Sequence, residues 1–335
     1  MPQSEPAIQV ADDIFQVRLP LPFALNIVNC YLLRDNDGWA MLDTGLNTAY
    51  AQAAWDAAFA ALSITPSDIT QIILTHVHPD HYGMAGWFQS LAAADAIPVV
   101  KMSPREAELA QLLWEGQGKQ AKAFDRYLAA CGMPAEMIPI VVTSLGSTGE
   151  MTHPHPTHIA TLNPGDSLTI GKRTFQAIHA PGHSDGQLIF YDPADKLLLS
   201  GDHVLMKITP NIGLWPDTEP DPLGRFLASL ESLRDLDVRL ALPGHKALIT
   251  DWRSRLDELL HHHARRLDHT LGAIEGGATI YEASLKVFNS LTFTPHEWRF
   301  AMVETLAHLE YLRLRGKVRQ ETAAHGLWRF YPIGT

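Results

Sequence analysis

The length, composition and charge of the chain are those of a globular protein. Its 335 residues exceed the usual domain size of about 100–150, so we expect one large core with an appendage or two domains. Apolar residues make up 46% and charged residues 19%, which excludes disordered, collagen-like and low-complexity proteins. The net charge of −11 is opposite in sign to the basic excess of a dedicated nucleic-acid binder.

The N-terminal part alternates between strand and helix patterns. Strands are predicted at residues 14–19, 27–33, 39–42, 72–74 and 98–102. Helices are predicted at residues 47–62 and 86–94. Asp35-Asn36-Asp37-Gly38 has the composition of a hairpin turn between two of the strands. This alternation favours a layered α/β domain with helices packed outside the sheets.

The middle of the chain interrupts this alternation with an insertion at about residues 103–164. Residues 103–130 are strongly helical in pattern, whereas residues 139–164 are rich in Thr, Ser, Pro, Gly and His and are predicted to form a long loop. Strand patterns then resume at residues 167–170, 174–179, 187–191, 196–200 and 239–242. A second half of the sheet structure is therefore expected.

The last part of the chain is predicted to be a small appended unit. Its pattern is helical from about residue 250 to residue 269, and Gly276-Gly277 interrupts it. Two further helices are expected at residues 279–288 and 294–314, followed by a two-stranded hairpin at residues 317–320 and 327–331. We therefore expect a catalytic domain over residues 1–250 and a C-terminal unit over residues 251–335.

The sequence has few features of a secreted or membrane protein. Cys30 and Cys131 are too few for a disulfide framework. The first residues lack a basic segment followed by an apolar run, and no apolar stretch reaches the roughly 18 residues that span a bilayer. We expect a soluble protein of the cytoplasm with no membrane partner, and homodimer formation is left open.

Histidine is abundant, with 17 residues, and the densest cluster is Thr75-His76-Val77-His78-Pro79-Asp80-His81. It follows a buried strand and is expected to be a loop, because Pro79 would break a helix. On a loop, His76 and His78 point one way while Asp80 and His81 turn toward a neighbouring position. Imidazole and carboxylate suit Zn²⁺, Fe or Mn, and two such ions about 3.5–4 Å apart form a hydrolytic centre.

Three later segments supply further donors in a common pattern. Each is an apolar run that ends in glycine followed by a donor, and the three pairs are Gly182-His183, Gly201-Asp202 and Gly244-His245. Because the carboxyl ends of strands lie along sheet edges, these donors can converge with the histidine loop. A lone buried histidine more often has a structural role than binds metal. The histidine loop and the three later segments together favour a metal centre.

This donor set resembles the metallo-β-lactamase-fold hydrolase superfamily, whose hallmark is an H-x-H-x-D-H loop with later His, Asp and His donors. The resemblance covers about residues 13–250 and implies a four-layer αββα sandwich. The ligands it implies are His76, His78 and His183 for a first metal and Asp80, His81 and His245 for a second. It further implies that Asp202 bridges both metals and that Asp43 orients the metal loop without binding metal.

The resemblance also implies a binuclear hydrolase. Two divalent ions, Zn²⁺ first with Fe or Mn as alternatives, would lower the pKa of a bridging water from about 15.7 to about 7. The bridging hydroxide would attack an acyl or phosphoryl centre. Asp80 would be the catalytic residue that orients this hydroxide and passes its proton to the leaving group.

The substrate is expected to be a thioester, lactone or other small acyl ester, because the donor set resembles the glyoxalase II and acyl-homoserine-lactone lactonase branches. Asp202 stands where β-lactamases commonly have a cysteine, which disfavours antibiotic hydrolysis. The chain also lacks a counterpart to the cationic glutathione-binding set of glyoxalase II.

The alternative is phosphodiester cleavage of nucleic acid. The C-terminal order of helices and hairpin resembles the winged-helix tail of β-lactamase-like hydrolases, including a mitochondrial endoribonuclease. Residues 280–335 carry seven Lys or Arg and five Asp or Glu, which is a weak basic signal. We therefore expect a small-molecule substrate rather than nucleic acid.

Several residues outside the donor set have two possible roles. Leu109, Leu112, Leu113, Trp114 and Phe124, together with the loop at residues 208–215, are expected either to wall the metal cleft or to bury the insertion. His153, His155 and His158 could belong to a pocket or lid, and His203 could contact the pocket or pack. Solvated or packed positions are expected for His261, His262, His263, His269, His296, His308 and His325.

Overall fold

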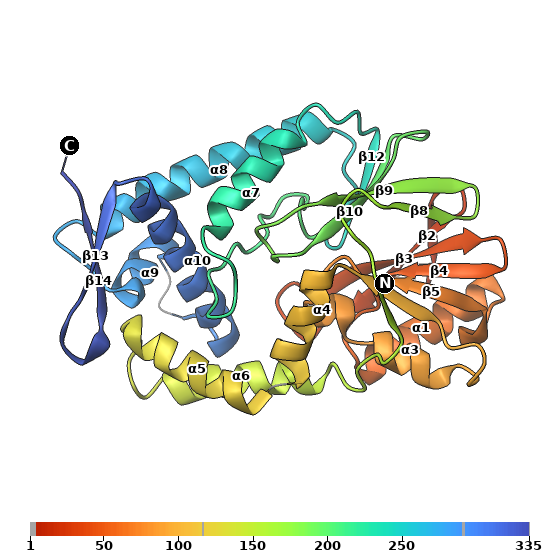
Figure 1. The fold of residues 1–335 in the computed structure, drawn as a ribbon, viewed down its shortest axis with the longest axis horizontal. Coiled ribbons are helices and arrows are strands. Elements are labelled where there is room, and N and C mark those ends of the chain that lie inside the picture. The colour runs from red at the N-terminus through yellow and green to blue at the C-terminus, as the bar shows by residue number, and fades with distance from the viewer. Residues whose placement is uncertain (1–4, 116, 290–291, 335) are drawn as a thin grey trace.

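The computed structural model of the protein describes residues 5–115, 117–289 and 292–334. Two β-sheets lie at one end and the C-terminal helices at the other (Figure 1). The seven-stranded sheet has the order β1–β2–β3–β4–β5–β6–β7, antiparallel from β1 to β4 and parallel from β4 to β7. Its strands are β1 (Ile8–Ala11), β2 (Ile14–Pro20), β3 (Ile27–Asp35), β4 (Gly38–Leu42), β5 (Ile69–Ile73), β6 (Val99–Met102) and β7 (Ile159–Thr161).

The second sheet has five strands in the order β12–β11–β10–β9–β8. All its pairs are antiparallel except β11 with β12, which is parallel. Its strands are β8 (Ser167–Ile170), β9 (Arg173–His179), β10 (Leu188–Asp192), β11 (Leu197–Gly201) and β12 (Leu240–Pro243). The second half of the sheet structure is therefore confirmed.

The sheets pack face to face, and helices cover their outer faces, which confirms the four-layer αββα sandwich. On β3, Tyr31 and Leu33 face the second sheet, whereas Cys30 and Leu32 face the helices, as the two-residue period of a strand requires. The outer helices of the first sheet are α1 (Ala49–Leu62) and α3 (Ala85–Leu91). Those of the second are α7 (Pro222–Ser232) and the first half of α8 (Trp252–Ala273).

The predicted hairpin turn between β3 and β4 is also confirmed. Asp35 pairs with Gly38, so the loop consists of Asn36 and Asp37. Gly38 has a φ of +153°, and a Cβ there would lie 2.4 Å from the carbonyl oxygen of Asp68. Glycine is therefore the residue that this turn accommodates.

The insertion is more helical than the sequence predicts. It contains α4 (Pro104–Ala110), a π-helical turn at Gln111–Glu115, α5 (Gln117–Ala130) and α6 (Ile138–Glu150). The prediction of a long loop over residues 139–164 is wrong for α6, although Thr, Ser and Gly are poor helix formers. Ile138 and Val141 are buried in a core shared with the C-terminal helices, and this packing outweighs the low local propensity.

The C-terminal unit shares that core. Its later elements are α9 (Ile280–Phe288), α10 (Pro295–Leu314), β13 (Val318–Thr322), a 3₁₀ turn (Ala324–Gly326) and β14 (Trp328–Pro332). β13 and β14 form the predicted antiparallel hairpin. Leu128 of α5 and Leu309 of α10 lie in one hydrophobic cluster. The boundary at residue 250 stays a prediction, and among the described helices none is long and apolar enough to cross a membrane.

Leu309→Ala tests the shared core. Leu309 is fully buried, so its truncation should lower the free energy of unfolding by about 2–5 kcal/mol in equilibrium urea unfolding. Hydrogen exchange should also become faster in α5, because α5 packs on the same cluster. Leu314→Ala on the same helix is the control, since Leu314 is 49% exposed and should change stability by less than about 0.5 kcal/mol. Equal effects of the two substitutions would contradict the shared core.

Candidate metal centre

The histidine loop begins directly after β5. His76 and His78 lie in the irregular segment that follows the strand, and Pro79 is the first residue of α2 (Pro79–Tyr82). Proline is tolerated there because the first helical N–H has no partner within the helix. The prediction that the loop continues through Asp80 and His81 is therefore wrong. Both residues lie on a single helical turn.

Three imidazoles form the first donor group. Nε2 of His76 lies 3.0 Å from Nδ1 of His78, which lies 2.8 Å from Nε2 of His183. Burial lowers the pKa of His183 and keeps its ring neutral. Its Nδ1 donates to the carbonyl of Asn211 at 2.8 Å, and because a carbonyl only accepts, Nε2 of His183 presents a lone pair. The three nitrogens thus face a common point.

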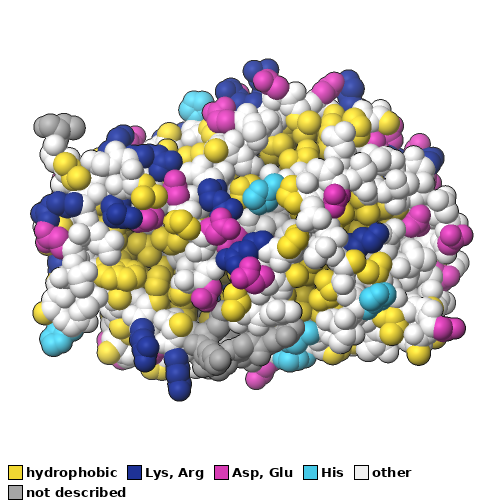
Figure 2. Space-filling model, in the orientation of Figure 1, with side chains coloured by type: hydrophobic (Ala, Val, Ile, Leu, Met, Phe, Trp, Pro, Cys, Tyr) yellow, Lys and Arg dark blue, Asp and Glu magenta, His cyan; other side chains and the backbone are white. Residues whose placement is uncertain are grey.

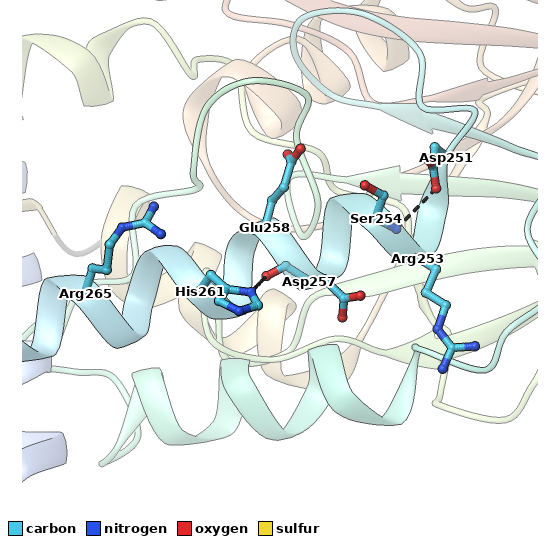
Figure 3. Close-up of a pocket in the computed structure, with 7 residues that line it drawn as sticks. All are labelled: Asp251, Arg253, Ser254, Asp257, Glu258, His261 and Arg265. Atoms are coloured by element: carbon cyan, nitrogen blue, oxygen red, sulfur yellow. Dashed lines mark hydrogen bonds between the residues drawn. The ribbon is translucent and has the colours of Figure 1, made fainter.

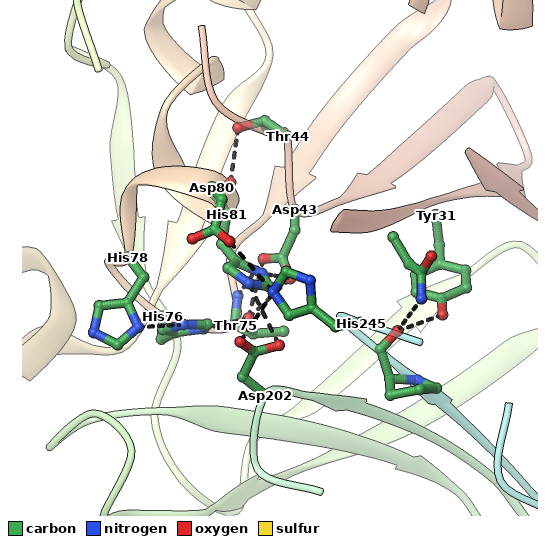
Figure 4. Close-up of polar contacts among 12 residues, drawn as sticks. Tyr31, Asp43, Thr44, Thr75, His76, His78, Asp80, His81, Asp202 and His245 are labelled. Carbon is green, nitrogen blue, oxygen red and sulfur yellow. Dashed lines mark hydrogen bonds and ion pairs between the residues drawn. The ribbon is translucent and has the colours of Figure 1, made fainter. Parts of the chain in front are cut away.

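Asp80, His81 and His245 form a second donor group, and Asp202 lies between the two groups (Figure 4). Nε2 of His245 is 3.3 Å from Oδ2 of Asp80 and 3.2 Å from Oδ2 of Asp202. Oδ1 of Asp202 is 3.5 Å from Nε2 of His81, and its Oδ2 is 3.6 Å from Nε2 of His183. The structure therefore brings together all seven donors that the sequence suggested.

The outer nitrogens of these histidines are held by fixed acceptors. Nδ1 of His81 lies 2.8 Å from Oδ2 of Asp43, whose carboxylate also accepts from the backbone N–H and hydroxyl of Thr75. Nδ1 of His245 donates to the carbonyl of Ile27 at 2.7 Å. Both contacts turn Nε2 toward the other donors. Asp43 itself stays outside the donor groups.

Polar atoms without hydrogen-bond partners mark the same point. Among the described residues, Nε2 of His81, Nε2 of His245 and Oδ1 of Asp202 are buried and make no hydrogen bond. Burial disfavours the charged form of His245, but Asp202 and Asp80 outweigh it and raise the pKa of His245 to about 10. The site thus favours positive charge. Its imidazole and carboxylate donors fit divalent metal ions.

Glu106 supports the centre and was missed by the sequence analysis. Its Oε2 accepts from the N–H of Val77 at 2.7 Å, and its Oε1 accepts from the Ser184 hydroxyl at 2.6 Å and the Gly186 N–H at 2.7 Å. One buried carboxylate therefore ties two donor-bearing loops together, and burial raises its pKa to about 7. The only sequence signal was Ser103 three residues earlier, which suggests a capping box and not an inward-facing side chain.

A cavity of about 320 Å³ opens onto the donors. The donors in its lining are His78, Asp80, His183, Asp202 and His245. The insertion contributes Leu109, Leu113, Trp114 and Phe124, and the loop at residues 208–215 contributes Ile208, Thr209, Pro210, Asn211 and Trp215. Both expected roles are found: the segments wall the cleft, except for Leu112, Ile212, Gly213 and Leu214, which are outside the lining. Leu109, Trp114 and Phe124 also lie in hydrophobic clusters and so bury the insertion.

The remaining histidines differ in their surroundings. His203 is buried, and its Nε2 lies 3.0 Å from the Ser229 hydroxyl, so its role is packing. Among the described residues, the cavity lining does not include His153, His155 or His158. His296 does line the cavity, although the sequence analysis expected it to be solvated or packed. His263 and His308 are buried, His262 is half-buried, and His261, His269 and His325 are exposed.

A second hollow lies on the exposed face of α8 (Figure 3). It measures about 520 Å³ and is lined by polar and charged side chains. Two of its contacts are local to the helix: Nδ1 of His261 bonds the carbonyl of Asp257, and the N–H of Ser254 bonds Asp251. Its lining includes none of the seven donors, so the first cavity is the candidate active site.

Two protein-family models match this chain. The model of the metallo-beta-lactamase superfamily matches residues 24–245, and that of the metallo-beta-lactamase-like C-terminal domain matches residues 267–333. A metallo-beta-lactamase family protein of Thermus thermophilus has a TM-score of 0.86 and 35% identity, covering 97% of this chain and 100% of its own.

Two curated relatives extend the comparison. The probable metallo-hydrolase YqjP of Bacillus subtilis is 25% identical over 90% of this chain and 92% of its own length. An atrochrysone carboxyl ACP thioesterase of Aspergillus fumigatus is 25% identical over 37% of this chain and 36% of its own.

Asp43→Asn tests how the donors are oriented. An amide that donates to Nδ1 of His81 would move the imidazole proton to Nε2, the atom that faces the other donors. Metal affinity should fall by about 10- to 100-fold in a competition titration with a chromophoric chelator. Asp56→Asn on the exposed face of α1 is the control and should keep wild-type affinity. Wild-type affinity in the Asp43 variant would refute the orienting role.

Proposed function

Because this chain belongs to the metallo-beta-lactamase superfamily and is a metal-dependent hydrolase, we propose that it cleaves a thioester, lactone or other small acyl ester at a binuclear metal centre. The observation that carries this proposal is the position of Asp202 between two complete donor groups at the wall of a largely apolar cavity.

Two metal ions are proposed because the donors fall into two sets. His76, His78 and His183 would hold one ion, and Asp80, His81 and His245 would hold the other. Asp202 would bridge them, since its two oxygens face histidines of different sets. Zinc is the proposed metal because it takes imidazole and carboxylate donors, and Fe or Mn are the alternatives.

When bound, such ions polarise a substrate carbonyl and lower the pKa of water at the site. The side chains of this protein supply the remaining steps. The Asp80 side chain is 18% exposed, against 8% for that of Asp202, so Asp80 is the donor carboxylate more open to the cavity. We assign Asp80 the role of orienting the attacking water and carrying its proton to the leaving group.

The cavity supports an acyl substrate. Its lining is dominated by hydrophobic side chains, among them Leu113, Trp114 and Phe124, which suit a small organic acyl group. The similarity to a fungal acyl carrier protein thioesterase agrees with thioester cleavage.

Phosphodiester cleavage is less well supported. Lys and Arg are interspersed with Asp and Glu over the face that Figure 2 shows. In the described part of residues 280–335, four arginines make ion pairs, which are Arg313–Glu310, Arg315–Asp221, Arg319–Glu321 and Arg329–Glu282. These pairs reduce the positive charge that would attract a phosphate backbone.

A substrate panel with the Asp202→Ala variant tests the proposal. The zinc-loaded protein should hydrolyse thioesters or lactones, and Asp202→Ala should lower kcat/KM by at least about 100-fold, because the second ion loses its shared ligand. Asp56→Ala should keep wild-type activity. Cleavage of RNA at physiological salt with no turnover of any thioester or lactone would contradict the acyl proposal.

A further inference from the structure

Arg299 is a buried cation in the wall of the active-site cavity. It lies near the start of α10 and is 4% exposed. Among the described residues it makes no ion pair, and its Nε and Nη1 make no hydrogen bond. A buried guanidinium usually has a carboxylate partner, because an uncompensated charge in a low-dielectric interior is strongly unfavourable. The fold thus retains a charge that it does not neutralise.

Two neighbours contact the guanidinium without neutralising it. The Nη2 atom of the guanidinium lies 3.1 Å from Nδ1 of His296, and its central carbon, Cζ, lies 5.0 Å from the centre of the Phe300 ring. Burial and then the charge of Arg299 lower the pKa of His296 to about 4, so this imidazole is neutral at neutral pH. Because arginine only donates, Nδ1 of His296 accepts and its proton lies on Nε2. His296 therefore adds a second N–H donor.

The surroundings of Arg299 and His296 keep these two N–H donors in place. The His296 ring stacks on Phe23 with centroids 4.5 Å apart and planes 6° apart. Burial lowers the pKa of Arg299 only to about 10, so it stays charged at neutral pH. Arg299, His296 and Phe300 line the same cavity as the metal donors Asp80 and His245. The cavity is therefore lined both by metal donors and by an arginine that makes no ion pair among the described residues.

We propose that Arg299 is a specificity-determining residue that binds an anionic group of the substrate, and that this group is a carboxylate remote from the bond that is cut. The proposal deepens the proposed acyl hydrolysis and rests on it. Nε and Nη1 of the guanidinium are buried and have no hydrogen-bond partner, and the planar fork of N–H groups to which they belong suits an oxyanion. The substrate class is thus an acyl ester or thioester with an apolar chain and one negative charge.

A carboxylate is preferred to a phosphate because of the rest of the lining. Arg299 is the only Lys or Arg among the residues that line the cavity in the described part of the chain. Asp80, Asp202 and Asp217 also line it and would repel a dianion more strongly than a monoanion. A single buried guanidinium therefore matches a single negative charge.

The test compares pairs of thioesters of equal length in the metal-loaded, full-length protein. In the first pair, a glutaryl thioester with a free carboxylate is compared with the same thioester whose carboxylate is a neutral methyl ester. In the second pair, the carboxylate or its methyl ester lies on the thiol leaving group instead. We expect wild-type kcat/KM to favour the carboxylate in at least one pair by about 10- to 100-fold. Arg299→Gln should abolish this preference while the neutral thioester is still cleaved. Arg315→Gln, at the C-terminal end of α10 and outside the cavity lining, should preserve it.

A binding measurement separates this proposal from the proposed function. Calorimetric titration with glutarate should show binding to wild type and at least 10-fold weaker binding to Arg299→Gln. Inorganic phosphate is titrated in the same way as the alternative anion. Binding without thioester turnover would leave the anion site in place and refute acyl hydrolysis. Equal cleavage of neutral and anionic thioesters, a preference that survives in Arg299→Gln, or binding of phosphate in preference to glutarate would each overturn the proposal. If Arg299→Gln does not fold, the proposal is judged by the preference for the carboxylate substrate in wild type and in Arg299→Lys. Lysine keeps the charge but lacks the planar fork of N–H groups.

Discussion

Imidazole nitrogens and carboxylate oxygens lie close together in the centre of the site and repel one another, and the surrounding structure has to hold them there. Seven imidazole and carboxylate side chains from four separate segments bring their donor atoms together. Carbonyl or carboxylate acceptors hold the outer nitrogens of His81, His183 and His245, so the rings cannot turn away. Such an arrangement is favourable only when a cation, either metal or proton, shares the space.

The C-terminal unit takes part in this arrangement through α10. The backbone carbonyl of Asn211 accepts a hydrogen bond from His183, and the side-chain amide of Asn211 donates one to Oε2 of Glu304 at 2.8 Å. α10 thus supports a donor through Glu304 and contributes Arg299 and His296 to the cavity. The shared hydrophobic core with α5 and α6 fixes the position of α10. Catalytic sandwich, insertion and C-terminal unit therefore meet at one site.

Local patterns predicted much of the fold and the seven side chains that the structure brings together. Alternating apolar residues located the strands, and each Gly-donor pair after a strand placed its histidine or aspartate at a sheet edge. The prediction failed where tertiary packing decides the outcome. α6 forms from a Ser- and Thr-rich segment because Ile138 and Val141 are buried. Glu106 gave only the signal of a helix cap and Arg299 gave none, because their surroundings depend on residues distant in the sequence.

Anomalous X-ray diffraction at the zinc absorption edge, on crystals of the zinc-loaded protein, can locate the metal ions. We expect two anomalous peaks, one among His76, His78 and His183 and one among Asp80, His81 and His245, with Asp202 in contact with both. The separation of the peaks should be about 3.5–4 Å. A single peak, or peaks away from these side chains in fully folded protein, would contradict a binuclear centre.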